Sequence, residues 1–408
     1  MRKCVIVPCI VLAGGLFFQI HYLFTHAQER HISKNRNDVK IQQDMTAVQT
    51  KPVDYNRTKT SGVSETLADS LFNHGNLLPL PKYKRDKTNV QNERRKADQT
   101  RTRKVQPFQY RSVIKEYTSL INWSYFTKKR NKILTKYSFD SFDILPESMK
   151  TDDQPYLIIM VLSVAHHPRT AIRKTYGSVS RGLMWPGSNL TLNTKVIFLL
   201  GRTSDFRHQA NLHAESNIHG DILQGNFIDS YENLTLKVLA GLHYVAEYHP
   251  GTQYVLKADE DTFTDVDLVV RLLKTLQPVN SVLGHVYEKP YVKRNGKWSI
   301  SESVYPFPLF PNYVSGNTYV LSMDYGKCIL ENAKYYQYIF IEDVFITGMM
   351  SSVCNATLYH VSGFTFWAES RPVPKTFLGG AKISGTRVTD TRKYGIWTYL
   401  NNWYHTGL

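Results

Sequence analysis

The sequence predicts an α/β fold in which a mostly parallel central sheet is covered by helices on both faces. From about residue 155 onward, short apolar runs of strand length alternate with segments of helical character. Such alternation is typical of an open sheet built from strand–helix–strand units. One apolar run, 253–258, ends in the acidic triplet Asp259-Glu260-Asp261. Because ligands of open α/β sheets bind at the carboxyl ends of strands, this triplet marks a candidate site.

The predicted elements follow one another in a regular order. Strands are expected in the apolar runs at 156–164, 195–200, 221–223, 253–258, 281–287 and 319–322. Helices are expected at 170–176, at 206–218 and from residue 231 onward. Asn295-Gly296 predicts a hairpin turn between Tyr291 and Trp298.

Composition divides the chain into three parts. The mostly apolar stretch 4–24 is long enough to span a bilayer, and Arg2 and Lys3 before it predict a cytosolic N-terminus. A cleaved signal peptide is the alternative. The stretch 28–105 lacks apolar clusters, which predicts a basic stem that is largely disordered in its first part. We therefore expect a cytosolic tip with a membrane anchor, a stem and a lumenal domain, at 1–27, 28–150 and 151–408.

Two further features indicate a lumenal destination. The chain contains Asn-x-Ser/Thr sequons, which are used only in the secretory pathway, at Asn56, Asn122, Asn189, Asn233 and Asn355. Outside the predicted anchor its cysteines are Cys328 and Cys354. In an oxidising compartment these two form either one disulfide or a pair of buried thiols, and the sequence leaves both open.

The formal net charge of +16 raises the question of nucleic-acid binding. Much of the excess lies between Lys82 and Lys104, in the predicted stem. No aromatic residue interleaves with the basic residues from Arg85 to Lys104, so the stacking platform of single-strand binders is missing. We expect no nucleic-acid partner and interpret the basic segment as a solvated spacer. Electrostatic attraction to a polyanion such as a sulfated glycan is the alternative.

The acidic triplet has two interpretations. Asp259 and Asp261 are one residue apart after a strand, an arrangement in which carboxylates hold a hard divalent cation that also binds phosphate oxygens. No glycine-rich phosphate-binding motif follows any predicted strand, so bound phosphates would depend on a metal ion and basic side chains. The alternative is a solvated turn whose carboxylates favour the N-terminus of the next helix.

A second acidic pair, Glu342-Asp343, is flanked on both sides by apolar residues. Charged side chains are rarely placed in such surroundings without a partner or a chemical task. One interpretation is an N-cap for a helix that begins near Val344. The other, compatible with it, is a general base. If a sugar nucleotide is the donor, Asp259 and Asp261 would hold the metal while Asp343 deprotonates the acceptor hydroxyl.

Four segments, in this order, match the motifs of one enzyme family. They are 169–177, in which Tyr176 replaces the usual Trp, 220–237, Lys257-Ala258-Asp259-Glu260-Asp261, and Glu342-Asp343-Val344 with Gly348. Together they resemble glycosyltransferase family 31, which includes the β-1,3-galactosyl and β-1,3-N-acetylglucosaminyl transferases. The resemblance extends from about residue 155 to 360.

This resemblance implies a GT-A-like catalytic domain over 151–408, a single-pass type II Golgi anchor, a UDP-sugar donor with Mn²⁺ or Mg²⁺, and inversion at the anomeric carbon. Asp261 would be the main metal ligand, Asp259 would contact the metal or the ribose, and Asp343 would be the base. Arginine suits phosphate better than lysine does, which favours arginines at the nucleotide. The donor-binding residues that the resemblance implies are Arg169, Arg173, Lys257, Asp259 and Glu260.

The chain departs from the family pattern in two places. Related enzymes carry a metal-binding His shortly before a C-terminal aromatic helix, and 383–388 contains none. Thr386 is expected at that position, with His360 or His405 as alternative ligands. The second departure is 316–319, where relatives usually have a further Gly, and it affects the acceptor side.

The predicted function is the inverting transfer of galactose, GalNAc or GlcNAc from a UDP-sugar to a glycan hydroxyl. The product would be a β-1,3 linkage on a glycoprotein or glycolipid. The rival hypothesis is a catalytically silent lumenal protein of the same fold that binds sugar nucleotides or serves as a scaffold. The missing His motivates this rival.

Overall fold

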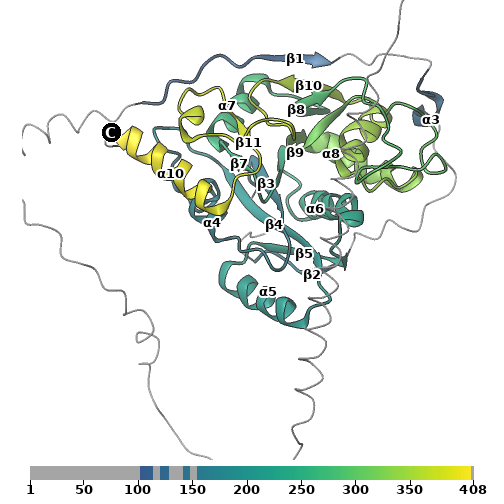
Figure 1. The fold of residues 1–408 in the computed structure, drawn as a ribbon. Helices are drawn as coiled ribbons and strands as arrows, with labels where there is room; N and C mark the ends of the chain where they lie inside the picture. The colour runs from purple at the N-terminus through teal and green to yellow at the C-terminus, as the bar shows by residue number, and fades with distance from the viewer. Residues whose placement is uncertain (1–101, 114–119, 128–140, 148–153, 406–408) are drawn as a thin grey trace, which may run out of the picture. The chain divides into compact units, whose positions relative to one another are not determined.

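A nine-stranded sheet runs through the part of the chain that the computed structural model describes, residues 102–113, 120–127, 141–147 and 154–405. The strand order is β1-β10-β8-β9-β6-β3-β4-β5-β2, so β1 and β2 form opposite edges (Figure 1). The strands of this sheet are β1 (Tyr110–Val113), β2 (Phe142–Ile144), β3 (Leu157–Leu162), β4 (Thr194–Arg202), β5 (Ile222–Ile228), β6 (Tyr254–Asp259), β8 (Ser281–Tyr287), β9 (Tyr313–Ser322) and β10 (Thr357–Val361). A separate small ladder pairs β7 (Phe263–Thr264) with β11 (Ser384–Gly385).

Most strands of the large sheet run in one direction. β3, β4, β5 and β6 pair in parallel, and β8 and β10 share their direction because β9 is antiparallel to both β6 and β8. The edge strands β1 and β2 are antiparallel to their neighbours. The predicted α/β fold with a mostly parallel sheet is confirmed at this level. One strand differs, because the run at 319–322 is the end of the longer strand β9, which begins at Tyr313.

The central strand β3 shows why continuous apolar runs in the sequence predict strands of this sheet. All six of its residues are apolar and buried. Its even-numbered residues pack into one hydrophobic core and its odd-numbered residues into another, since successive side chains of a strand point to opposite faces. A strand that is buried on both faces is apolar at every position, so it shows no alternation with polar residues.

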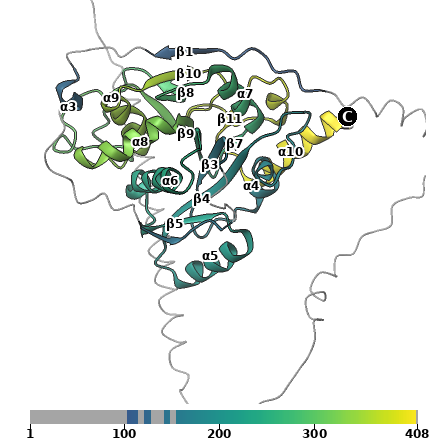
Figure 2. The same cartoon turned by 180° about the vertical axis from the view of Figure 1, so that it is seen from behind.

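Helices cover both faces of the sheet (Figures 1 and 2). One core takes side chains from α6 and α8, and the other takes side chains from α4, α7 and α10. The carboxylates of Asp205 and Asp265 accept backbone hydrogen bonds at the starts of α5 and α7, which places both helix starts. The helices are α3 (Ser124–Thr127), α4 (Thr170–Lys174), α5 (Phe206–His219), α6 (Leu234–Tyr248), α7 (Val266–Leu276), α8 (Met323–Asn332), α9 (Met350–Val353) and α10 (Asp390–His405).

Residues that precede 150 take part in this fold. β1 pairs with β10, and β2 pairs with β5. Arg103 is buried and donates hydrogen bonds to Asp265 (2.9 Å) and Asp267 (3.1 Å), the carboxylates at the start of α7. The range 28–150 that the sequence assigned to the stem therefore supplies both edge strands and a buried ion pair.

The predicted membrane anchor, 1–27, and the first part of the stem lie outside the described residues. Across the part of the chain that is described, no helix combines the length and the apolar character needed to cross a bilayer. The anchor, its orientation and the domain boundary at 27 remain predictions.

The segment between β8 and β9 is a loop and not the predicted hairpin. Gly296 has a φ of +86° in a turn, as the Asn-Gly pair indicated, but Tyr291 forms its bridge with Leu309 and not with Trp298. The guanidinium of Arg294 holds this loop together by donating hydrogen bonds to the carbonyls of Ile300, Tyr305 and Phe307, at 2.8–2.9 Å.

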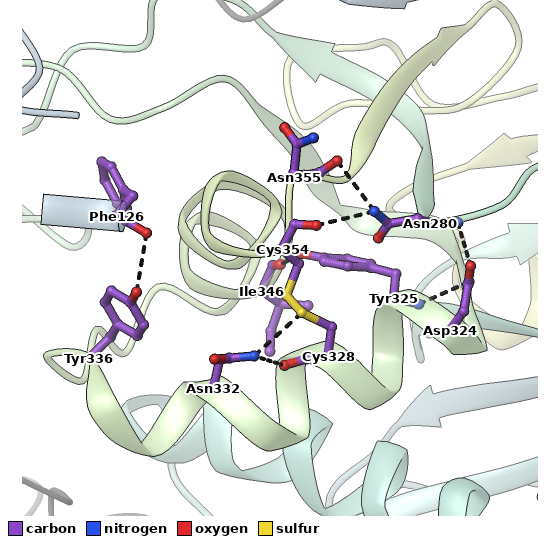
Figure 3. The surroundings of a disulfide bond; sticks show 10 residues. All are labelled: Phe126, Asn280, Asp324, Tyr325, Cys328, Asn332, Tyr336, Ile346, Cys354 and Asn355. Atoms are coloured by element: carbon purple, nitrogen blue, oxygen red, sulfur yellow. Dashed lines mark hydrogen bonds between the residues drawn. A yellow bond between two sulfur atoms is a disulfide. The ribbon is translucent and has the colours of Figure 1, made fainter. Parts of the chain in front are cut away.

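A disulfide joins Cys328 of α8 to Cys354, which follows α9 (Figure 3). The Cα atoms are 6.1 Å apart, and the bond closes a sequence separation of 26 residues. Asn332 donates a hydrogen bond to the Cys328 carbonyl (2.8 Å), and Asn280 donates one to the Cys354 carbonyl (3.1 Å), as Figure 3 shows. The sequence left these cysteines paired or free, and the structure pairs them.

Replacing both cysteines by Ala is expected to lower the free energy of unfolding by about 3 kcal/mol, because the loop is no longer closed in the unfolded chain. Urea unfolding followed by circular dichroism measures the change. As a control, wild-type protein unfolded under reducing conditions should lose a similar amount, and an unchanged urea midpoint in the variant would contradict the expectation.

Candidate functional site

Lys257 lies between the two acidic clusters. Strand β6 carries its side chain into the interior, where Nζ is 2.6 Å from Asp259 Oδ1 and 3.5 Å from Glu342 Oε2 and donates a hydrogen bond to the Gly316 carbonyl. Burial by itself lowers the pKa of Lys257, but the charges of Asp259 and Glu342 outweigh it and raise that pKa. The ammonium group therefore stays charged and ties β6 to β9 and to the second acidic pair.

Asp343 lines a cavity of about 300 Å³ that Lys257 and Asp259 also line. Its carboxylate accepts hydrogen bonds from the backbone N–H groups of Gly316 and Val344, both at 2.9 Å. The second bond caps the π-helix Val344–Met349, as the sequence predicted for a helix that begins near Val344. A Cβ at position 316 would lie 2.9 Å from Asp343 Oδ2, so only glycine allows this approach.

The two carboxyls of the second acidic pair differ in their surroundings. Glu342 is buried, and Tyr319 donates a hydrogen bond to it. Burial, reinforced by the charge of Asp343, raises the pKa of Glu342 to about 7. Burial raises the pKa of Asp343 to about 6, although Lys257 opposes the shift. Asp343 is only half-buried at the cavity, which makes it the better candidate for contact with a ligand.

The carboxylates of the acidic triplet also have different environments. Asp259 pairs with Lys257, whereas the Asp261 carboxylate makes no hydrogen bond with any residue that the structure describes. Partial burial, followed by the charge of Asp259, raises the pKa of Asp261. Two neighbouring carboxylates that repel each other fit Mg²⁺ or Mn²⁺, which completes its coordination sphere with phosphate and water oxygens. Among the described residues, no group of three His, Cys, Asp or Glu side chains forms a metal site.

The segment 383–388 runs beside the triplet. The Val388 N–H donates to the Asp261 carbonyl (2.7 Å), and Thr386 is buried. Thr386 Oγ1 accepts a hydrogen bond from Asn317 Nδ2 at 3.1 Å. Thr386 therefore lies two residues before the backbone contact with the triplet, in the segment where the family pattern has a His, and its hydroxyl is hydrogen-bonded to a residue of β9.

The two alternative histidines lie elsewhere. His360 is in β10, three strands from β6 and thus roughly 14 Å away within the sheet, and its Nδ1 accepts a hydrogen bond from Val286 N–H. His405 ends α10, roughly 22 Å along the helix from Asp390, where α10 begins near the triplet. Their positions argue against either as a ligand beside Asp261.

Arg169 is connected to the triplet through a single hydroxyl group. Its Nη1 donates to Ser163 Oγ (3.1 Å), and Ser163 Oγ donates to Glu260 (2.9 Å). Its Nε donates to Glu215 of α5 (2.8 Å). Arg169 and Glu260 therefore meet at the carboxyl end of β3. A donor-binding role for either residue remains a prediction.

Arg173 lies beside Arg169, because its Nη1 donates a hydrogen bond to Glu215 Oε1 (2.6 Å), the oxygen that also accepts from Arg169 Nε. Its Nε and Nη2 both donate to Asp221 at 2.7 Å, and it lines a different cavity of about 520 Å³. Its guanidinium pairs with Asp221 and Glu215, as that of Arg169 pairs with Glu215, and its contact with the nucleotide remains a prediction.

Lys237 is a buried lysine near the site to which the sequence analysis assigned no role, although it lies in one of the family motifs. Lys237, on α6, is buried, with Nζ 2.6 Å from Asp229 Oδ1 and 2.9 Å from the Ser163 carbonyl. It therefore fixes the end of β5 and the residues that follow β3. The signal was present, because Asp229 and Lys237 both belong to the segment 220–237 that carries the resemblance.

The predicted sequons differ in accessibility. Asn122, Asn189 and Asn355 are exposed, so a glycan has room there. Asn233 is half-buried, and its Nδ2 donates a hydrogen bond to the Ile228 carbonyl at 2.8 Å. Asn56 lies outside the described residues.

The mostly parallel sheet, covered by helices on both faces and carrying carboxylates at the end of β6, defines an α/β protein with a candidate site at its strand ends. Residues 167–362 match the model of the family described as Galactosyltransferase. Human "Beta-1,3-galactosyltransferase 5" is 36% identical over 246 residues, which cover 59% of this chain and 74% of the relative. Mouse "Beta-1,3-galactosyltransferase 1" is 29% identical over 249 residues, 59% of this chain and 73% of the relative. This chain belongs to the galactosyltransferase family, as its resemblance to glycosyltransferase family 31 indicated.

Substituting Lys257 by Met is expected to cost about 3–5 kcal/mol of folding free energy, because Asp259 and Glu342 then lose their shared counterion. Chemical denaturation at pH 8, above the pKa of about 7 of Glu342, measures the loss. The matched control is Lys274→Met on the exposed end of α7, for which a change within about 0.5 kcal/mol is expected. Equal effects of the two substitutions would show that Lys257 does not hold the clusters together.

Proposed function

We propose that this protein is an inverting β-1,3-hexosyltransferase that uses a UDP-sugar, with a GT-A-like catalytic domain. The observation that carries the proposal is the shared cavity of Asp343 and Asp259, with Lys257 between them. The acidic triplet would bind the metal ion and the leaving diphosphate, and the second acidic pair would deprotonate the attacking hydroxyl. A single base without a protein nucleophile is the arrangement that inversion requires.

Asp343 acts as the general base. It accepts the proton of the acceptor hydroxyl while that oxygen forms a bond to the anomeric carbon. The bond between this carbon and the β-phosphate oxygen breaks on the opposite face, UDP departs with the electron pair, and the configuration inverts. A base with a pKa of about 6 is ionised at neutral pH and still takes up a proton readily.

The acidic triplet supplies the donor side of the reaction. Asp259 and Asp261 would hold Mn²⁺ or Mg²⁺, and the ion supplies charge that stabilises the departing diphosphate. Lys257 orients Asp259 through their ion pair at 2.6 Å. Ser163 and Arg169 hold Glu260 at the end of β3, next to the same diphosphate.

The family names of the relatives favour galactose as the transferred hexose, with GalNAc and GlcNAc as the other donors to screen. The acceptor is a glycan on a glycoprotein or glycolipid. We place the catalytic domain in the Golgi lumen behind a single type II anchor. The disulfide and the exposed sequons support a secretory location.

A second candidate function rests on Thr386. If the family's His is indispensable for the metal, the chain keeps the fold and the sugar-nucleotide cavity but lacks turnover, and it serves as a lumenal binding protein or scaffold. Release of UDP from UDP-galactose in the presence of Mn²⁺ separates the two functions, because only the enzyme produces it catalytically.

Asp343→Asn is expected to lower kcat about 10²–10⁴-fold, because the amide cannot accept the proton, while UDP and Mn²⁺ still bind. The wild-type kcat/KM should fall tenfold per pH unit below about pH 6, as the raised pKa of Asp343 is crossed and the base becomes protonated. Steady-state kinetics from pH 5 to 8 measure both effects.

The variant should lose this acid limb. Calorimetric titration with UDP and Mn²⁺ provides the control for site integrity. If the Asn variant loses UDP binding as severely as turnover, Asp343 is structural and the assignment as base is wrong.

Asp261→Ala is expected to abolish transfer and to weaken Mn²⁺-dependent UDP binding, because one of two carboxylate ligands is removed. The melting temperature should stay close to that of the wild type, since the Asp261 side chain makes no hydrogen bond within the described structure. Activity and metal titration are measured together. Undiminished UDP release and transfer by the variant would refute the metal assignment.

A further inference from the structure

The cavity at Asp343 has an aromatic and basic outer wall that the proposed reaction does not use. Besides the catalytic carboxylates it is lined by Trp298, Trp367, Tyr231, Tyr291, Lys293 and Lys297. Trp367 and Tyr291 are 57% and 74% exposed, which is unusual for rings of this size. Exposed rings beside a polar cavity offer the flat apolar faces on which sugar rings pack.

The rings of this outer wall hold one another in place. Trp298 Nε1 donates a hydrogen bond to the Tyr231 hydroxyl at 2.8 Å, and the Trp298 and Trp367 ring centroids are 5.9 Å apart. Tyr231 in turn packs edge-on against Phe340, at 6.0 Å between centroids. The wall therefore connects the β8–β9 loop with the start of α6 and with the segment that leads to Asp343.

The basic residues of the loop have different tasks. The guanidinium of Arg294 donates hydrogen bonds to three backbone carbonyls within the loop. The ammonium groups of Lys293 and Lys297 instead lie over rings, 4.6 Å from the centroid of Trp298 and 4.5 Å from that of Tyr231. Both lysines are exposed, and no carboxylate of the described residues forms a salt bridge with either.

The three carboxylates and three lysines that line the cavity are unevenly placed, because Asp259, Glu342 and Asp343 lie at its inner end with Lys257. The inner carboxylates Asp259 and Glu342 already share Lys257 as their counterion. Lys293 and Lys297 add two positive charges at the mouth, on the same wall as the aromatic rings. A ligand complementary to this wall has a sugar ring that packs on the aromatic faces and a negative group that pairs with the ammonium ions.

We infer that the acceptor glycan carries an anionic substituent, a sulfate ester or a carboxylate, and that Lys293 and Lys297 select for it. This inference rests on the proposed function, because it assigns the outer wall to the acceptor of that reaction. The two lysines act on specificity, by ion pairing with the acceptor beside the sugar that receives the hexose.

Binding without a donor tests the inference independently of turnover. The purified full-length protein is titrated with N-acetyllactosamine, with its 6-O-sulfated form and with a disaccharide of glucuronic acid and N-acetylglucosamine, while tryptophan fluorescence is followed. At least one anionic saccharide should bind about fivefold to tenfold more tightly than the neutral one, as two exposed charge pairs allow. The sulfated and carboxylated probes distinguish the two anions.

The Lys293→Gln/Lys297→Gln double variant should lose this preference and keep its affinity for the neutral saccharide. The control is Lys274→Gln/Lys327→Gln, which removes two exposed lysines of α7 and α8 and should keep the preference. Raising the salt concentration should weaken the preference for the anionic saccharide in the wild type and in the control variant, because both keep the two ammonium groups.

Transfer assays on the same saccharides complete the test. The double variant should raise the KM for the anionic acceptor with little change in kcat or in the KM for the UDP-sugar. Equal binding of neutral and anionic saccharides by the wild type overturns the inference, as does a rise in the UDP-sugar KM, which would assign the lysines to the donor. Anion-selective binding without any turnover would refute the proposed function, and with it the role of acceptor, while the two lysines would still be shown to select an anionic glycan.

Discussion

One buried cation organises the candidate site. Lys257 pairs with Asp259 and Glu342 and donates to the Gly316 carbonyl, so a single ammonium group joins β6, β9 and the turn before the π-helix. Its charge is taken up by one carboxylate from each acidic cluster. Asp261 of the first cluster and Asp343 of the second form no salt bridge with Lys257 in the described structure. In the proposed reaction, this unequal sharing of one positive charge separates the donor side from the acceptor side.

The central strands could be predicted because a strand that is buried on both faces consists mostly of apolar residues. β3 and β6 lie between neighbours on both sides and are apolar along most of their length, so their positions were evident from composition alone. The edges could not be predicted in the same way. β1 and β2 have four and three residues, and three of the four residues of β1 are exposed. No apolar period marks so short and solvated a strand.

The acidic residues of the site were predictable, whereas most of their partners were not. Asp259 and Asp261 stood out at the end of a predicted strand, and Asp343 stood out as a charge between apolar residues. One hydrogen bond to Asp343 comes from the backbone N–H of Gly316. Because every residue except proline has such a group, the sequence does not show which one will act as the donor. The outer wall depends on the path of a loop. Its Asn-Gly turn was visible, but the bridge between Tyr291 and Leu309 that shapes the loop was not.

The edge strands have a practical consequence for any recombinant fragment. A fragment that starts at residue 151 lacks β1 and β2, which leaves β10 and β5 as open edges of the sheet. It also lacks Val113, Ile121 and Phe126, which are buried in the hydrophobic core. Open edges beside uncovered apolar surface promote intermolecular strand pairing and aggregation. A soluble secreted form therefore has to begin ahead of Arg103, well inside the stretch that composition alone assigns to a linker.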